Sequence, residues 1–344
     1  MFFLAAAGIS GAEQPAAQVV FLRGIVDLHR DGQIIELFES DVGMTLHNQD
    51  LLETGNDGAL ILELTGLASP GSRITVAENT AFFLEVRGAG RLRIPLLAGS
   101  LSLKIESLLS SESLSVRSQT VTLGVRGTEF AVTLAPEGSL LVICSQGLVE
   151  CQDEQGRPVH AQPGQAVERR SGESLRGIGL DSGEEALYQS FWTGQRNQVF
   201  RAGAPTFIRA YAQQYQNYLP RFSEAYQKVA AHQGTLLRYR GGAGELNRDL
   251  LLAYTEISRD LVPALGVINL FEQVFYSVRT LQGFHSQGIG VSRISANQTS
   301  QEFFNNFNSY EPILQRQLAQ THYLYKLFME MAETVSPGGL LPWD

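Results

Sequence analysis

The amino-acid sequence predicts an α+β multidomain chain, with an N-terminal all-β domain of short strands, arranged as a solenoid, a roll or a sandwich, followed by a C-terminal α-helical bundle. The first half consists of strand-length segments that alternate polar and apolar residues between turns, whereas apolar residues recur at helical spacing in the second half. Aromatic residues are divided at the same place, because residues 1–180 hold only 7 of the 31, all of them Phe. The predicted boundaries are residues 13–177 for the β domain and 178–344 for the helical domain.

The composition limits the classes of partner. The 344 residues include 26 Lys and Arg against 35 Asp and Glu, a formal net charge of -9. A nucleic-acid partner is not expected, since phosphate backbones bind clustered Lys and Arg. No segment reaches the roughly 18 uninterrupted apolar residues of a membrane span, so no transmembrane helix is expected either.

The N-terminus resembles the remnant of a signal peptide. Residues 1–12 hold a short apolar run that ends in small residues, with Ser10 and Ala12 placed as they are before a cleavage site. A mature chain that begins near Glu13 and a periplasmic or secreted location are therefore expected. The basic region that usually precedes the apolar run is missing, so either the start lies upstream or the segment is an apolar strand or helix docked on the core.

Strand patterns follow one another through the first half. Asp31-Gly32 divides the first pair of segments, as expected for a tight hairpin turn, and Asn56-Asp57-Gly58 divides the second. The later strand-rich segments, separated by Gly, Pro, Ser or Asn, cover residues 72–86, 88–105, 113–125, 129–134, 138–152 and 157–168.

The two cysteines lie in one of these segments. The sequence around Cys144 and Cys151 predicts two short strands joined by a turn at residues 145–147, with both cysteines diagonal to each other on one face of the hairpin. A disulfide is one outcome, although a diagonal pair is near the upper limit of disulfide reach. Two buried small apolar side chains are the other.

Four or five helices are predicted in the second half. The first carries Phe207, Tyr211, Tyr215 and Phe222 at helical spacing and should end or kink at Pro220. Segments 245–261 and 264–281 have the dense apolar pattern of interior helices. The last apolar stripe is interrupted at Pro312 and consists of Phe303, Phe307, Tyr310, Leu314, Leu318, Leu324, Phe328 and Met331. Aromatics at this spacing indicate a packed core rather than a ligand platform.

The sequence contains none of the common catalytic or cofactor motifs. There is no phosphate-binding G-x-x-x-x-G-K-[ST], no H-E-x-x-H, no G-x-S-x-G and no C-x-x-C. Histidines occur singly, although metal sites usually show at least one close pair of ligands. No catalytic residue, metal ligand or cofactor is therefore predicted. The histidines are His29, His47, His160, His232, His285 and His322.

One short motif stands out as a candidate bend or binding site. In "VTLGVRGTEF" the two glycines would permit a close backbone approach or a turn, and the arginine and glutamate would leave the strand near each other. A hydrogen bond from these charged groups would lock the bend, so a structural role is favoured over ligand contact. The candidate residues are Gly124, Arg126, Gly127, Thr128, Glu129 and Phe130.

The same motif resembles the signature of the FecR-like domain. "GVRGTEF" is the most specific part of the resemblance, which covers residues 19–170 and includes the segments "DLLETGNDGALILEL" and "LLAGSLSLKI". The resemblance implies a bacterial, extracytoplasmic all-β module used for sensing or protein contact. Family members that regulate sigma factors use a cytoplasmic N-terminal segment and a transmembrane helix, which are not expected here, so that role is not carried over.

Three functions remain open. The first is a non-catalytic envelope protein whose FecR-like domain binds an envelope protein or a glycan. The second is an enzyme that acts on cell-wall glycan, with carboxylates drawn from Glu224, Glu245 and Asp249 of the helical domain. The third is a structural spacer that holds the helical bundle away from a membrane.

Overall fold

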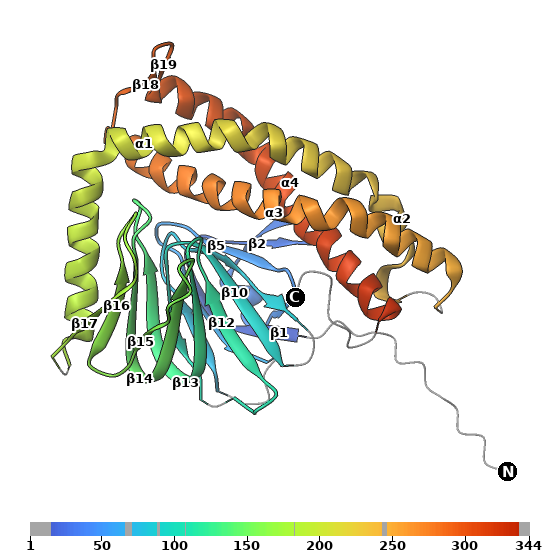
Figure 1. Ribbon diagram of the computed structural model, residues 1–344, viewed down its shortest axis with the longest axis horizontal. Helices are drawn as coiled ribbons and strands as arrows, with labels where there is room; N and C mark the ends of the chain where they lie inside the picture. The colour runs from blue at the N-terminus through green and yellow to red at the C-terminus, as the bar shows by residue number, and fades with distance from the viewer. Residues whose placement is uncertain are drawn as a thin grey trace.

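The computed structural model describes residues 15–65, 71–87, 90–106, 108–181, 183–242 and 246–336. Strands β1–β17 precede helices α1–α4, and the helices lie across one end of the strands (Figure 1). The predicted fold class, a β-rich N-terminal region followed by C-terminal helices, is thereby confirmed. The expected signal segment, residues 1–12, lies outside the described residues.

Most of the strands are short, as the spacing of turn residues predicts. Their bounds are β1 Pro15–Arg23, β2 Val26–Arg30, β3 Gln33–Leu37, β4 Thr45–His47, β5 Leu51–Thr54, β6 Ala59–Leu64, β7 Arg73–Val76, β8 Ala81–Phe83, β9 Glu85–Val86, β10 Arg91–Ala98, β11 Ser100–Lys104, β12 Ser113–Arg117, β13 Val121–Leu134, β14 Leu140–Asp153, β15 Val159–Ala161, β16 Gln165–Arg169 and β17 Arg176–Gly179. The helices are α1 Glu185–Ala231, α2 Gln233–Arg238, α3 Arg248–His285 and α4 Ser300–Val335, and a small hairpin, β18 Arg293–Ser295 and β19 Gln298–Thr299, precedes α4.

The strands form two sheets that share β13 and β14. In the first sheet the order is β4-β1-β6-β7-β11-β13-β14-β16-β17. In the second the order is β3-β2-β5-β8-β10-β12-β13-β14-β15, with β9 continuing the line of β8. Among the described strands of these two sheets, every pairing is antiparallel except that of β10 with β12, which is parallel. The β region is therefore a sandwich.

The described part of the chain packs around three apolar cores. The largest is built from the inward side chains of both sheets, such as Leu62 and Ile94, which are fully buried. A second core joins the outer face of the second sheet, including Phe83 and Leu97, to α1, α3 and α4. A small third core packs Trp192 of α1 against Ile143 on the outer face of the first sheet. Helices therefore cover part of the outer face of each sheet.

The ribbon of β13 and β14 passes from one sheet to the other at the "GVRGTEF" motif. Before the motif, β13 pairs with β12 of the second sheet, and after it β13 pairs with β11 of the first. The register shifts here, because Gly127 and Thr128 lie opposite the single residue Gly147. The extra residue changes which side chains of β13 face the core. Odd-numbered residues such as Val125 point inward before the bulge, and even-numbered residues such as Phe130 point inward after it. The motif forms the corner of the sandwich.

The three glycines of this corner, Gly124, Gly127 and Gly147, differ in whether their positions could accept a side chain. Gly147 has a φ of +83°, and a Cβ there would lie 2.5 Å from the carbonyl oxygen of Gly127. Gly127 has a φ of +58°, but a Cβ there would have nothing closer than 4.0 Å. Gly124 has ordinary backbone angles, and its Cβ would meet only Glu150 at 3.9 Å. The expectation that Gly124 permits a close backbone approach is therefore wrong.

The predicted hairpin at residues 145–147 is also wrong. Strand β14 runs without interruption from Leu140 to Asp153, and Gly147 uses its positive φ for a bulge instead of a turn. Cys144 and Cys151 thus lie seven positions apart on one strand instead of facing each other on two. Both are free and buried, so the disulfide is absent and they pack as small apolar side chains.

Both thiols should resist modification in the native protein. Burial raises the pKa of Cys144, and it raises the pKa of Cys151 to about 12, so thiolate is scarce at pH 8. With Ellman's reagent at pH 8 we expect release of chromophore from both thiols only after unfolding in guanidinium chloride. Rapid release from either thiol in the native protein would contradict the buried placement.

The helices are longer than the sequence predicts, because prolines do not end them. Helix α1 contains both Pro205 and Pro220, and α4 continues through Pro312. Figure 1 shows that α1 rises along the first sheet and then bends to lie over α3. A proline inside a helix removes one backbone hydrogen bond and can produce such a bend.

Helix α3 alone among the described helices is long and apolar enough to cross a membrane by length and composition. Half of its apolar stretch is buried inside the fold. The central helix of a soluble protein has the same properties, and α3 packs against both α1 and α4. The expectation that the chain has no transmembrane helix is therefore qualified by this one segment.

Candidate functional site

The described motif residues lie at the sandwich corner and not at a cavity, and the Arg126 side chain, with the hydrogen bond predicted for it, lies outside the description. Phe130 is in the core, Thr128 is buried, and Glu129 pairs in register with Lys104 of β11. Gly124 pairs with Glu150 of β14. Among the described residues, none of the motif lines either of the two cavities described below.

Of the carboxylates proposed for a glycan-acting enzyme, the two that the structure describes, Glu224 and Asp249, are not brought together. Glu224 lies on the surface of α1 and forms a salt bridge of 2.8 Å with Lys228 in the next turn. Asp249 lies exposed in the first turn of α3, where an acid stabilises the helix dipole. Glu245 lies outside the described residues. Neither Glu224 nor Asp249 lines the cavities below.

The helices are fastened to the second sheet by a buried acid, Glu53 of β5. Its carboxylate accepts a hydrogen bond of 2.5 Å from the Tyr276 hydroxyl and an ion-paired hydrogen bond from Arg279, both on α3. His29 of β2 places Nε2 3.1 Å from the same carboxylate. Arg279 also binds Glu311 of α4 at 2.7 Å. We call these residues the Glu53 clamp.

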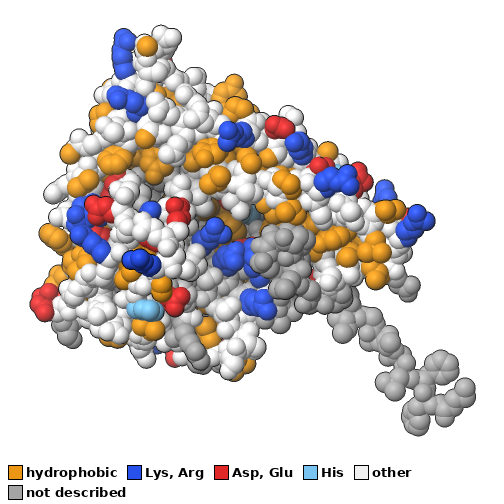
Figure 2. Space-filling view, viewed as in Figure 1, with side chains coloured by type: hydrophobic (Ala, Val, Ile, Leu, Met, Phe, Trp, Pro, Cys, Tyr) orange, Lys and Arg blue, Asp and Glu red, His pale blue; other side chains and the backbone are white. Residues whose placement is uncertain are grey.

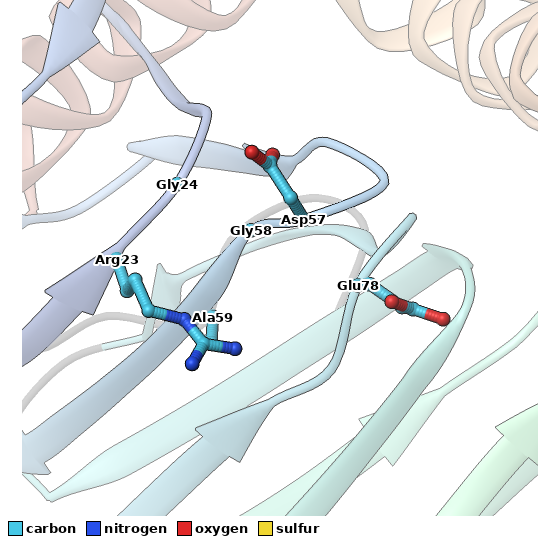
Figure 3. Close-up of a pocket in the computed structure, with 6 residues that line it drawn as sticks. All are labelled: Arg23, Gly24, Asp57, Gly58, Ala59 and Glu78. Atoms are coloured by element: carbon cyan, nitrogen blue, oxygen red, sulfur yellow. The ribbon is translucent and has the colours of Figure 1, made fainter.

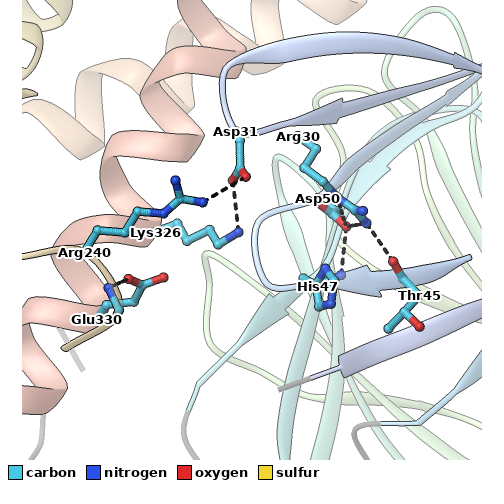
Figure 4. Close-up of polar contacts among 9 residues, drawn as sticks. Arg30, Asp31, Thr45, His47, Asp50, Arg240, Lys326 and Glu330 are labelled. Atoms are coloured by element: carbon cyan, nitrogen blue, oxygen red, sulfur yellow. Dashed lines mark hydrogen bonds and ion pairs between the residues drawn. The ribbon is translucent and has the colours of Figure 1, made fainter. Parts of the chain in front are cut away.

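A second contact joins the tip of the β2–β3 hairpin to α4 (Figure 4). Lys326 donates to Asp31 at 3.1 Å, and Arg240 lies 3.6 Å from the other oxygen of that carboxylate. Below the tip, Arg30 binds Asp50 at 2.5 Å. The hairpin is therefore fixed by charge from both the helical side and the sheet side.

A third contact holds the first part of α1 on the first sheet. The indole N–H of Trp192 donates to the Glu168 carboxylate at 3.0 Å. Arg170 and Arg176 donate to the same carboxylate at 2.9 and 2.5 Å. Burial would raise the pKa of Glu168, but these three donors outweigh burial and lower it.

A small surface pocket of about 500 Å³ lies where the turn at Gly24 crosses the turn at Asp57. Figure 3 shows the side chains of Arg23, Asp57 and Glu78 pointing in different directions around it. Asp57 is engaged by the backbone N–H of Ile25 at 3.2 Å. Groups that diverge in this way do not converge on a ligand, so this pocket is a consequence of the turns.

The larger cavity, about 720 Å³, lies between the second sheet and helices α3 and α4, and we call it the arginine groove. Its floor is the outer face of β10 and β12, where the parallel register sets Arg91 beside Ser113, Arg93 beside Ser115 and Pro95 beside Arg117. Figure 2 shows Lys and Arg side chains gathered near the centre of the face, below the helices and beside a hollow in the surface.

The roof of the groove combines apolar side chains with polar ones, such as Asn269 and Gln273 of α3. Helix α3 contributes Val262, Leu265 and Ile268, and α4 contributes Tyr325 and His322. His322 binds Glu272 at 2.8 Å and Gln49 at 2.9 Å, which fixes its ring. Burial would lower the pKa of His322, but the Glu272 carboxylate outweighs burial and raises it.

Positive charge exceeds negative charge in the groove. Four arginines line it against two acids, Glu85 and Glu272. Glu85 is engaged by Arg87 at 2.7 Å and lies 3.6 Å from Arg93, and Glu272 is engaged by His322. The pKa of Arg93 is lowered, chiefly by burial. The Glu85 carboxylate acts to raise this pKa, whereas the positive charges of Arg87 and Arg117 lower it further. In a chain of net charge -9, such a surface suits an anion.

The sequence held a partial signal for this groove. In residues 91–97 arginines alternate with apolar residues, and in residues 113–117 serines and an arginine do the same, so each strand has one polar face. Such alternation is typical of a strand with one face in solvent. It did not show that helices from the second half cover this polar face and leave a cavity above it.

Comparison with known proteins assigns the β region. Residues 50–150 match the family model described as FecR protein, within the 19–170 expected from the sequence. No curated protein matches the chain. Two crystal structures of a proposed anti-sigma factor from Parabacteroides distasonis ATCC 8503 are similar at 12% identity, with TM-scores of 0.34 and 0.33. They cover 39% and 40% of this chain, and the chain covers 61% and 62% of theirs. On this match, residues 50–150 form a FecR-like domain, which includes the strands of the groove floor.

Proposed function

We propose that this protein is a non-catalytic sensing and interaction protein of the bacterial cell envelope, periplasmic or secreted, whose FecR-like domain binds an envelope protein or a glycan. A FecR domain indicates a signalling or sensing role. The observation that carries the proposal is the position of the arginine groove, which has FecR-domain strands as its floor and helices α3 and α4 as its roof.

A partner that occupies this groove would contact the FecR-like domain and the helices at the same time. The floor and roof come from segments that are about 150 positions or more apart, as Arg117 and Leu265 illustrate. Binding there would change the free energy of contact between the FecR-like domain and the helices. A sensor needs its bound and free states to differ in this way, because a ligand shifts an equilibrium only through its different affinities for two states. The acidic remainder of the chain would disfavour anionic partners elsewhere on the surface.

The proposal is tested by capture from an envelope extract of the source bacterium on immobilised full-length protein. We expect one envelope component to be retained by the wild type and lost in the Arg91→Glu/Arg117→Glu variant, because the change reverses the charge of the groove mouth. Arg157→Glu, in the exposed turn after β14, is the control for reversing a surface charge and should retain the component. Equal retention by the groove variant would count against the proposal, as would a wild type that retains no more than bare resin.

A further inference from the structure

We propose that the arginine groove binds a small organic anion, an oxyanion head of the phosphate or carboxylate type joined to an apolar body. This inference names the chemical feature that a partner presents to the groove, and in that respect it rests on the proposed function. The inference rests on the geometry and charge of the groove. A floor that carries guanidinium and hydroxyl groups faces a roof that includes the aliphatic side chains of Val262 and Leu265, and the cavity between them is about 720 Å³. That volume is in the range of small-molecule sites.

The floor supplies donors for the head group. Arg91 and Arg93 lie two positions apart on β10 and so project from the same face, and Arg117 lies beside Pro95 on the neighbouring strand. Arg93 and Arg117 are diagonal neighbours, a relation in which Cα atoms lie about 7–8 Å apart, within reach of one another for long side chains, and Arg91 lies one pair further along the strands. Guanidinium forks match the oxygens of carboxylates and phosphates. Ser113 and Ser115 add hydroxyl donors between them.

Two of these arginines are available to a ligand. The side chains of Arg91 and Arg117 are exposed and have no hydrogen-bond or salt-bridge partner among the described residues, whereas Arg87 and Arg93 share Glu85. Arg93 is half-buried beside two like charges that disfavour its own charge. An incoming anion would offset that repulsion, because an opposite charge within several ångströms favours the protonated guanidinium.

The roof supplies the contact for the apolar body. Val262 is partly exposed, lines the groove and belongs to none of the three apolar cores. Leu265, three positions further along α3, is also partly exposed and lines the groove. A bare inorganic anion would leave these side chains in water, whereas an aliphatic arm of a few carbons would cover them, at about 0.8 kcal/mol for each buried CH₂. Selectivity for amphiphilic anions over inorganic ones follows.

Isothermal titration of the full chain with hexyl phosphate, hexanoate, inorganic phosphate and hexanol tests the inference. We expect hexyl phosphate or hexanoate to bind at least ~10-fold more tightly than inorganic phosphate, and hexanol to show no saturable binding. The tighter of the two amphiphiles identifies the head group. Failure of both to bind saturably at millimolar concentration would overturn the inference.

Variants test separately the residues that would bind the head group and the residue that would contact the apolar body of the ligand. Arg91→Ala and Arg117→Ala should each weaken the tighter amphiphile ~10-fold or more, the loss of a charged hydrogen bond, with an unchanged melting temperature because both side chains are exposed. Arg157→Ala is the matched control and should bind as the wild type. Val262→Thr, nearly the same shape, should weaken the amphiphile but not inorganic phosphate. Unaltered binding in both groove arginine variants would place the ligand elsewhere.

The two proposals fail separately. If the amphiphilic anions bind as expected while no envelope component is captured, the site is real and the proposed partner interaction is wrong. If a component is captured through the groove while no anion binds, the partner interaction stands and the ligand class is wrong.

Discussion

Replacing Glu53 by Gln should lower the free energy of unfolding by about 3 kcal/mol, since breaking a buried ion pair leaves the remaining charge without its partner. This estimate is at the low end of the usual range, because Arg279 keeps its second acid, Glu311. Glu53 itself is 7% exposed and holds groups from β2 and α3 together. Urea unfolding followed by far-ultraviolet circular dichroism measures the change.

A surface pair provides the control for this substitution. Glu63 lies 3.7 Å from Arg73, which is 57% exposed, and Glu63→Gln should change stability by no more than about 0.5 kcal/mol. If Glu53→Gln were as mild as Glu63→Gln, the Glu53 clamp would not be what holds the helices on the sheet.

The clamp also gives stability a pH dependence. Burial would raise the pKa of Glu53, but Arg279, His29 and the Tyr276 hydroxyl outweigh burial and lower it well below its usual value. Because the folded pKa is depressed, the clamp's contribution is complete above the unfolded pKa of about 4.3 and is lost as the pH falls below it. The difference in unfolding free energy between the wild type and Glu53→Gln should therefore shrink as the pH falls below about 5.

Replacing Gly147 by Ala should destabilise the protein by roughly 3–5 kcal/mol, because a positive φ costs about 1–3 kcal/mol and the backbone clash is added to it. The added Cβ would lie 2.5 Å from the Gly127 carbonyl oxygen and 2.7 Å from Cγ2 of Thr128. Backbone atoms of the partner strand cannot move away without opening the corner. The measurement is the shift of the thermal unfolding midpoint.

The other two corner glycines are matched controls. Gly127→Ala should cost about 1 kcal/mol, since it has positive φ but room for the side chain. Gly124→Ala should be within about 0.5 kcal/mol of the wild type, since it has neither constraint. A reversed order, with Gly124→Ala the most damaging, would show that the corner does not have this geometry.

Much of the β region could be predicted from the sequence, because alternation of apolar and polar residues directly reports which face of a strand is buried. Asp31-Gly32 is one such success, since it forms the tip of the β2–β3 hairpin with both residues at positive φ. The failure at Gly147 has a physical reason. A glycine with positive φ serves equally well in a tight turn and in a bulge, and only the partner strand decides between them.

The helix ends and the groove could not be predicted for a related reason. Pro220 and Pro312 lie inside helices whose tertiary packing outweighs the loss of one backbone hydrogen bond each. Arg91 and Arg117 have the pattern of residues in solvent, and nothing local to them indicates that α3 lies above. Contacts between segments this far apart leave no periodic signal in either segment.

The Glu53 clamp has a consequence for the order of events during synthesis. It joins residues 223 and 226 positions apart, whereas the β13–β14 ribbon joins residues no more than 32 apart, as Val121 and Asp153 show. Closing the longer loop costs roughly 2 kcal/mol more in chain entropy. Until α3 has left the ribosome, the outer face of β5, β8 and β10 has no cover, and Leu51, Phe83 and Leu97 are open to water. Nascent chains at that length carry the greatest exposure to aggregation and to chaperones.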